Sequence, residues 1–255
     1  CHLEEPKLTE KQAKEKKLNY EASLRVKLKI TNLKNNTTKE QEVYFGDIPV
    51  MTNRSTFIIN GIEKVVISQI IRSAGVYFSS VNFRGKKLFG AKVIPLRGAW
   101  LEFETDSDGA IEVKIDRKRK VAATELLKIF GLETTEQIKQ VFKEEESKNY
   151  LEATLKKTTS TSLEEAYIEV YRRLRPGELP TYDSAHDLIN NMFFRLDRYD
   201  LAKVGRYKLN QRLNLNKDIS KRQLDLEDLI AIIKEIIKLN NDPKAKDDDI
   251  DHLGN

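Results

Sequence analysis

The sequence has little of the chemistry that most enzymes and membrane proteins need. It contains one cysteine and three scattered histidines, so an intramolecular disulfide is impossible, a structural zinc site is not expected, and a reducing compartment is indicated. No apolar run reaches the roughly 18 residues of a membrane-spanning helix. No Ser/His/Asp or Cys/His set has interpretable spacing, and there is no glycine-rich phosphate loop. We therefore expect no catalytic residues and no cofactor in this chain.

One pattern resembles a metal site, the aspartate cluster within residues 247–251. We interpret it as a solvated acidic loop or a turn beside a helix, and expect no metal.

Positive charge is unevenly distributed along the chain. Residues 1–120 contain 23 Lys and Arg against 15 Asp and Glu, whereas residues 121–255 contain 22 against 25. A basic half suits a protein that meets a polyanion, although lysine-rich surfaces also simply keep proteins soluble.

Apolar and polar residues alternate through most of the first 116 positions, as in antiparallel strands with one buried face. This alternation places Val43, Phe45 and Ile67 in a core, and Asn60-Gly61 predicts a hairpin turn. The predicted strands are 23–30, 39–45, 57–59, 64–69, 75–79, 88–94, 100–104 and 110–115.

After residue 120 the apolar period becomes helical. Ser162 is expected to start one helix in a capping box with Glu165, and Asp225 to cap the last helix. The predicted helices are 122–130, 134–146, 162–174, 184–194 and one beginning at 226. The fold class is therefore α+β, an antiparallel strand-rich domain followed by a helix-rich one. The expected domains are 1–116, 117–225, and 226–255 as a helix and return segment toward the first domain.

Seven sequence blocks occur in an order that a chance hairpin would not reproduce. They are GDIPVMT at 46–52, TFIINGIE at 56–63, VVISQIIRSAGV at 65–76, RKRK at 117–120, YRRLRPGE at 171–178, RYDLAKVGRYKLN at 198–210 and DDIDHLGN at 248–255. Together they resemble the protrusion and lobe domains of the bacterial-type DNA-directed RNA polymerase β subunit. The resemblance covers most of the chain and assigns 1–116 to the protrusion and 117–225 to the lobe.

The resemblance implies nucleic-acid handling. In this family the two domains form one jaw of the DNA cleft and hold the non-template strand of the transcription bubble, with a pocket for an unpaired guanine. The matching positions are Arg72, Trp100, Ile250 and Asp251. Indole stacking on a base is worth about 1–3 kcal/mol, and a carboxylate can accept both Watson–Crick-edge donors of guanine. A core position for Trp100 and a local turn for Asp251 remain alternatives.

Further positions match family residues near the same strand. They are the basic run Arg117, Lys118, Arg119 and Lys120 and the lobe residues Arg175, Glu178 and Arg198. From the basic run we expect two or more phosphate contacts, with the remaining cations solvated. For the lobe residues, a structural salt bridge is an equally good interpretation.

Two other sets follow from the resemblance. Thr38, Lys39 and Glu40 open an edge strand to which CarD-like regulators and the transcription-repair coupling factor add a strand in this family. An ordinary charged edge is the alternative. The second set matches the amino-terminal part of the rifampicin-response region, whose main cluster would lie beyond residue 255, so drug binding is not expected. It comprises Lys64, Ile67 and Gln69.

The sequence thus predicts part of a nucleotidyltransferase whose catalytic magnesium is bound by another subunit. The expected partners are the alpha, beta-prime and sigma subunits, non-template DNA and transcription factors, in the cytoplasm (nucleoid) or a plastid. The absent initiator methionine and the ending inside DHLGN suggest a segment of a longer chain. Two alternatives remain: a docking module for CarD-like or repair-coupling regulators without a DNA role of its own, and a free-standing basic DNA-binding adaptor.

Overall fold

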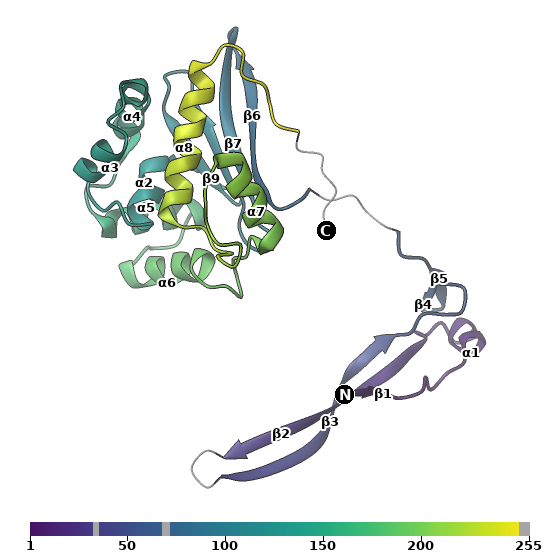
Figure 1. Ribbon diagram of the computed structural model, residues 1–255. Coiled ribbons are helices and arrows are strands. Elements are labelled where there is room, and N and C mark those ends of the chain that lie inside the picture. The colour runs from purple at the N-terminus through teal and green to yellow at the C-terminus, as the bar shows by residue number, and fades with distance from the viewer. Residues whose placement is uncertain (33–35, 68–71, 250–255) are drawn as a thin grey trace. The chain divides into compact units, whose positions relative to one another are not determined.

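The computed structural model describes residues 1–32, 36–67 and 72–249, and its contacts divide the chain into two compact units, Cys1–Gln69 and Ile70–Asn255 (Figure 1). The boundary expected near residue 117 falls inside the second unit. The reason is that the strands before this position and the helices after it bury one common core. Antiparallel strands dominate the early part of the chain and helices the later part, so the α+β class is confirmed.

The first unit is built from an antiparallel sheet of order β1-β2-β3, a two-stranded hairpin β4-β5, and one short helix. The Asn60-Gly61 turn joins β4 to β5 with φ of 52° and 76°, the positive values that a type I′ turn requires, so this prediction is confirmed. The elements are β1 (His2–Leu3), α1 (Glu10–Glu15), β2 (Glu21–Asn32), β3 (Thr37–Pro49), β4 (Phe57–Ile59) and β5 (Ile62–Lys64).

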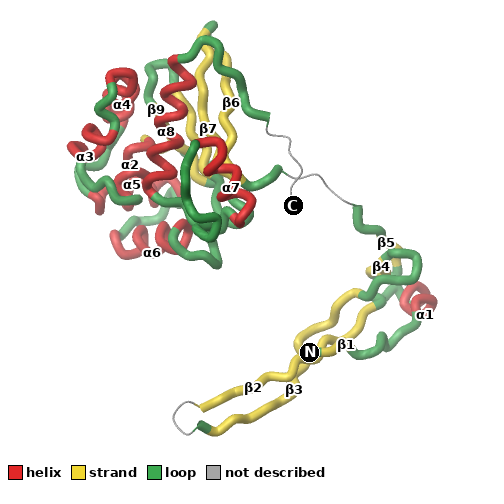
Figure 2. The backbone as a smooth tube through the Cα atoms, viewed as in Figure 1, coloured by secondary structure: helices red, strands yellow, loops and turns green. Residues whose placement is uncertain are grey.

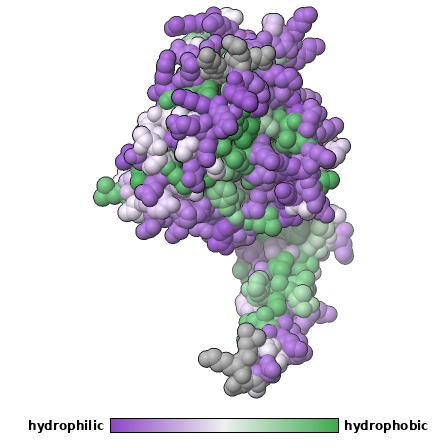
Figure 3. Space-filling view, turned by 60° about the vertical axis from the view of Figure 1, so that its left-hand side comes forward, coloured by the Kyte–Doolittle hydropathy of each residue, from purple (hydrophilic) through white to green (hydrophobic). Residues whose placement is uncertain are grey.

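The apolar residues that alternation assigned to a core in this unit are exposed instead. Val43, Phe45 and Ile67 are 37%, 75% and 76% exposed. Within the described residues of this unit, the only helix, α1, packs mainly on β4 rather than on the β2–β3 hairpin. A bulge opposite Leu24/Arg25 also disturbs the register near Phe45. Ile67 lies outside any strand, since β5 ends at Lys64. Figure 3 shows hydrophobic side chains along the visible face of this hairpin.

The second unit contains a five-stranded antiparallel sheet of order β10-β9-β8-β7-β6. Burial alternates strictly along β8 and β9, so one sheet face is covered and the other is open. The shortest strand, β10, was not predicted, because it lies within and just after the basic run. The strands are β6 (Gly75–Phe83), β7 (Lys86–Ile94), β8 (Leu101–Thr105), β9 (Ile111–Ile115) and β10 (Lys120–Ala122).

Helices form the second layer of this unit, as Figures 1 and 2 show. The packed apolar faces of α2, α5 and α8 join the covered sheet face in one core. Within the described ranges, no helix is long and apolar enough to cross a membrane. The helices are α2 (Ala123–Ile129), α3 (Thr135–Val141), α4 (Glu145–Lys157), α5 (Leu163–Leu174), α6 (Tyr182–Phe193), α7 (Ala202–Leu213) and α8 (Leu226–Asn241).

Two helix predictions need correction. The helix expected over 134–146 ends at Val141, because Phe142 leaves the helical conformation at φ −109° and ψ 36° while its ring is buried; α4 then starts separately. Ser162 does cap α5, but Glu165 does not complete a capping box. Its carboxylate instead accepts the N–H of Thr161 at 2.6 Å. The N-cap predicted at Asp225 is confirmed.

The segment after α8 runs back along the free edge of β6. The Asp248 N–H donates to the Phe78 carbonyl at 2.8 Å, and the Asp248 carboxylate accepts the Phe78 N–H at 2.9 Å. Asp247 accepts from the hydroxyl of Ser80 at 2.7 Å. These two aspartates of the acidic cluster therefore bind the sheet edge. Arg212 of α7 ties the same segment down through Asp248 at 2.9 Å.

Candidate nucleic-acid interface

One end of the five-stranded sheet gathers the chain segments that contain the predicted binding residues. Gly75 at the start of β6 pairs with Ile94 at the end of β7, and Leu101 at the start of β8 pairs with Ile115 at the end of β9. The segments 72–74, 95–100 and 116–119 therefore leave the sheet at the same end. We call this the basic end of the sheet. Its cationic and aromatic members are Arg72, Arg97, Trp100, Arg117, Lys118, Arg119, Arg198 and Lys208.

A tight turn after β9 brings Arg117 over Trp100. Asp116 and Arg117 both have positive φ, 50° and 60°, and the Lys118 N–H donates to the Ile115 carbonyl at 3.0 Å. These are the dihedral angles of a type I′ turn, here without glycine. Each left-handed residue of this kind costs roughly 1–3 kcal/mol, which contacts with the surrounding structure must offset. The Arg117 guanidinium carbon lies 5.3 Å from the centroid of the half-buried Trp100 ring. At this distance the guanidinium and the indole ring form a cation–π contact.

The cations of the basic run lie in two different electrostatic environments. Lys120 points to Glu104 at 2.6 Å, across the open sheet face. Burial raises the pKa of Glu104, but Lys114 and Lys120 outweigh it and hold this pKa below its usual value. Lys118 and Arg119 are exposed and have no ion-pair partner among the residues that the structure describes. The cations free to meet a phosphate are therefore those at the turn.

The RYD motif lies against the loop that precedes Trp100. Asp200 and Arg97 exchange two backbone hydrogen bonds of 2.8 and 3.1 Å. Gly98, at φ 118°, is the residue that allows this approach, because a Cβ there would lie 2.9 Å from the Arg198 carbonyl oxygen. Arg198 is exposed beside this contact, and the Arg97 guanidinium donates to the Asp197 carbonyl at 3.2 Å. Both arginines thus belong to the basic end of the sheet.

The remaining predicted residues of the guanine site are placed only in part. Arg72 is exposed just before β6 and makes no cation–π contact with Trp100 in the described part of the chain. Ile250 and Asp251, and likewise Gln69 of the rifampicin set, lie outside the described residues. The structure therefore brings Arg72 and Trp100 to one sheet end without testing the pocket itself.

The YRRLRPGE motif at 171–178 forms a local ion pair after α5. The Arg175 guanidinium lies 3.2 Å from a Glu178 carboxylate oxygen, and the Tyr171 hydroxyl donates to the other oxygen at 2.6 Å. The Tyr171 hydrogen bond, followed by the Arg175 contact, keeps the pKa of Glu178 below its usual value. Both charged side chains remain exposed, so the salt bridge forms while the pair stays accessible.

The predicted docking strand lies at an edge of the first unit's sheet. Within the described residues β3 pairs with β2 alone, so its other backbone edge is unpaired. Thr38 and Lys39 are exposed, and Glu40 lies 2.7 Å from Lys27 of β2.

Of the residues that match the rifampicin-response region, Lys64 is exposed at the end of β5.

Sequence reasoning missed two cations at the basic end. Arg97 precedes the matched tryptophan by three positions, and its proximity to Arg198 depends on a tertiary contact. Lys208 of α7 packs its aliphatic stem against Gly75, where a Cβ would lie 3.3 Å from the Lys208 Cβ. A helical period over 202–213 would have been the available signal, but the polar content of α7 hides it.

Comparisons with known proteins agree with the motifs. Residues 72–255 match the family model described as RNA polymerase Rpb2, domain 2. The chain is 48% identical over 252 residues to the DNA-directed RNA polymerase subunit beta of Syntrophomonas wolfei, covering 98% of this chain and 22% of that protein.

Two other relatives give the same result. The subunit beta of Streptomyces coelicolor is 44% identical over 266 residues, covering 99% of this chain and 23% of that protein. That of Gloeobacter violaceus is 44% identical over 254 residues, covering 99% and 22%. The chain thus spans less than a quarter of the length of these relatives.

Proposed function

Since the chain belongs to the RNA polymerase Rpb2 domain 2 family, as part of a bacterial-type β subunit, we propose that the basic end of its sheet binds single-stranded nucleic acid. In the whole polymerase this strand is the non-template strand of the transcription bubble, and the chain forms one jaw of the DNA cleft. The alpha, beta-prime and sigma subunits are the proposed partners. The catalytic magnesium belongs to another subunit, and this segment contributes no catalytic residue.

The observation that supports the proposal is the Trp100–Arg117 pair at the basic end of the sheet. Proteins that bind single strands combine aromatic rings, on which bases stack, with cations that follow the phosphates. Lys118 and Arg119 project from the same turn as Arg117 and lack ion-pair partners within the described ranges. One turn thus supplies both parts of such a site.

Removing the two turn cations tests the electrostatic part. We expect Lys118→Ala with Arg119→Ala to weaken binding of single-stranded DNA by the 255-residue chain equally for all sequences. The slope of log K against log salt concentration should fall by up to about 1.4, because each lost phosphate contact contributes about 0.7. Fluorescence anisotropy of labelled oligonucleotides between low and physiological salt measures this slope.

The matched control is Lys244→Ala with Lys246→Ala, which removes two exposed lysines from the segment after α8. The neighbouring Ala245 carbonyl contacts Lys87 at the start of β7, at the opposite end of the sheet. A salt slope that changes equally in both double variants would contradict a phosphate path at the turn.

The proposal includes a base-specific site formed by Arg72, Trp100, Ile250 and Asp251. We expect Asp251→Ala in the whole polymerase to shorten the lifetime of open complexes with guanine at the pocket position. Complexes with adenine there should change less, because only guanine presents two adjacent donors to a carboxylate. Equal shortening with all four bases would exclude guanine recognition by Asp251.

A second function is favoured by the unpaired edge of β3. Edge strands offer backbone donors and acceptors to an added strand, and we propose that a CarD-like regulator or the transcription-repair coupling factor docks there. Thr38, Lys39 and Glu40 would select the partner through their charge and polarity. The exposed apolar side chains of Val43 and Phe45 add contact area on the same strand.

Exchanging the charges of this edge tests the docking role. Lys39→Glu with Glu40→Lys should weaken binding of a CarD-like regulator to the polymerase, while promoter-independent RNA synthesis is retained. The backbone edge remains, so the loss should come from mismatched charges. The control is Lys11→Glu with Glu15→Lys, which exchanges an exposed pair within α1 of the same unit. Equal regulator affinity in both variants would exclude this edge as the site.

A further inference from the structure

We propose that the buried ion pair of Arg206 and Asp228 positions the Trp100 loop for nucleic-acid binding, acting through Arg222 and Asp200. The inference rests on the proposed function and assigns a role to the RYDLAKVGRYKLN motif beyond its exposed arginine. Arg206 and Asp228 are positioning residues, since neither can reach a ligand. Three successive links connect them to the basic end of the sheet.

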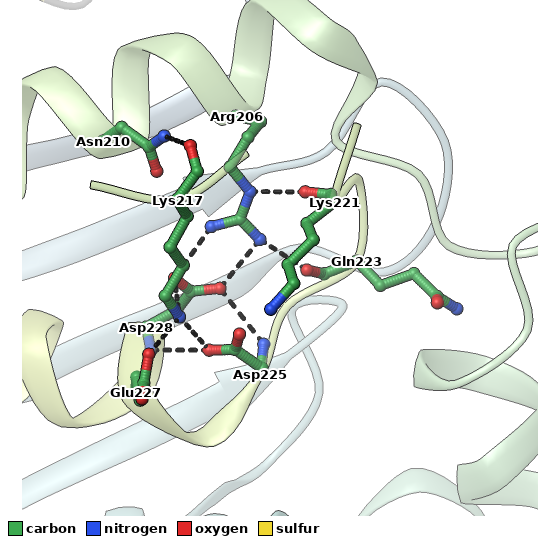
Figure 4. Close-up of polar contacts among 8 residues, drawn as sticks. All are labelled: Arg206, Asn210, Lys217, Lys221, Gln223, Asp225, Glu227 and Asp228. Atoms are coloured by element: carbon green, nitrogen blue, oxygen red, sulfur yellow. Dashed lines mark hydrogen bonds and ion pairs between the residues drawn. The ribbon is translucent and has the colours of Figure 1, made fainter. Parts of the chain in front are cut away.

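The first link is the guanidinium of Arg206, which reaches from α7 to both α8 and the preceding segment (Figure 4). It binds the two Asp228 carboxylate oxygens at 2.8 and 2.9 Å, and both side chains are fully buried. It also donates to the carbonyls of Lys221 and Gln223. A guanidinium presents its donors in a rigid plane, so this one side chain fixes residues 221–223 relative to two helices.

The second link is Arg222, in the middle of that fixed segment. Its carbonyl accepts the Leu201 N–H at 2.7 Å, and its guanidinium donates to an Asp200 carboxylate oxygen at 2.7 Å. The other Asp200 oxygen accepts the N–H of Ala202, which opens α7 at φ 57°. The segment held by Arg206 therefore holds the RYD turn from two sides.

The third link joins the RYD turn to the tryptophan loop. Asp200 exchanges both backbone hydrogen bonds with Arg97, and Gly98 is so close to Tyr199 that a Cβ would lie 2.8 Å from its ring. Two residues later, the Trp100 carbonyl accepts the Asp116 N–H at 2.8 Å. The loop is thus held at both ends, by the RYD turn and by the turn that places Arg117 over the ring.

Held in this way, the indole is available to a base without first being ordered. Binding that must immobilise a mobile side chain or loop loses affinity, because the lost conformational freedom opposes association. A rigid aromatic platform avoids this loss. The alternative is that Arg222 acts only as one more cation near the strand. In that case its neighbour Lys221, which is exposed, would contribute equally.

The test compares Arg222→Met with Lys221→Met in the 255-residue chain. Both variants lose one positive charge at adjacent positions, but only the first breaks the link to Asp200. Trp100 is the single tryptophan, so its fluorescence reports the loop directly. We expect Arg222→Met to increase acrylamide quenching of Trp100 and to weaken single-stranded DNA binding by about 2- to 10-fold. Lys221→Met should leave the quenching unchanged. Arg222→Lys, which can still pair with Asp200, should keep the quenching close to that of the unmodified chain.

Equal quenching in Arg222→Met, Lys221→Met and the unmodified chain would overturn the positioning role. If Arg222→Met fails to fold, Asp200→Asn decides, with the exposed Asp197→Asn as its control, by the same quenching measurement. The quenching readout needs no DNA. A failure of the proposed function would therefore appear separately, as unchanged DNA affinity when Trp100 itself is replaced.

Discussion

Replacing Trp100 with alanine should weaken the binding of single-stranded DNA about 5- to 150-fold, the largest loss expected for any one side chain of the basic end. The estimate follows from about 1–3 kcal/mol per stacked base. The ring is half-buried and fixed at the basic end of the sheet, beside cations that a phosphate backbone can reach. Because every base has a π-face, the loss should be similar for oligonucleotides of different sequence. Anisotropy titrations at constant salt measure it.

The control for this prediction is Phe83→Ala. Phe83 is a partly exposed aromatic residue at the far end of β6, and the Arg84 guanidinium lies 5.3 Å from its centroid, the distance found for Arg117 and Trp100. It therefore matches Trp100 in chemistry and in its cation–π contact, but not in position. A comparable loss of affinity in both variants would mean that the chain binds DNA through any exposed ring, and would contradict a specific site.

The sequence predicts this fold correctly where the apolar pattern of a segment agrees with the way that segment is packed in the structure. In β8 and β9 they agree, since alternate residues meet a helix layer that buries them. Period-two alternation identified both strands to within one residue. In β3 the same alternation identified the strand but not the environment of Val43 and Phe45, which stay exposed. Alternation shows that one face of a strand is apolar, but it does not show whether another element covers that face.

Helices with a clear apolar stripe, such as α5 and α8, were predicted, whereas α7 was missed and α4 was predicted only at its first two residues. The stripe of α5, with Ala166 and Val170 among its buried members, made that helix visible. The missed helix α7 buries Gly205, Leu209 and the charged Arg206. A glycine and an arginine facing inward do not register as apolar, because their burial depends on close packing against Ala74 and on an ion pair made by tertiary structure.

The candidate site shows the same division. Resemblance identified Trp100 and the basic run one by one, but not their mutual arrangement. Arg117 covers Trp100 because two left-handed residues turn the chain after β9. Aspartate tolerates positive φ, but arginine rarely adopts it, so the Asp116-Arg117 pair does not predict this turn from sequence. Likewise, no local signal connects Arg97 with Asp200, which are distant in sequence and meet through backbone bonds.

The buried charges of this network should be the most sensitive positions for stability. Arg206→Met should lower the free energy of unfolding by about 3–5 kcal/mol, because removing one partner of a buried ion pair leaves the other charge uncompensated. Asp228 is fully buried, and two backbone carbonyls would lose their donor as well. The Lys217 ammonium, 3.0 Å from Asp228, moderates the loss toward the lower end of this range. Urea denaturation followed by circular dichroism measures the change.

The control is Arg195→Met, which breaks an equally short but exposed ion pair with Asp197 and should change stability little. The double variant Arg206→Met with Asp228→Leu separates charge from packing. If the cost of Arg206→Met arises mainly from the stranded Asp228 carboxylate, the double variant should regain stability, because apolar replacement of both partners removes the uncompensated charge. It should not regain the fixed Trp100 loop, since the carbonyls of residues 221 and 223 would still lack their guanidinium. A double variant as unstable as Arg206→Met, with an unchanged Trp100 signal, would contradict both the electrostatic origin of the stability and the link from this pair to the interface.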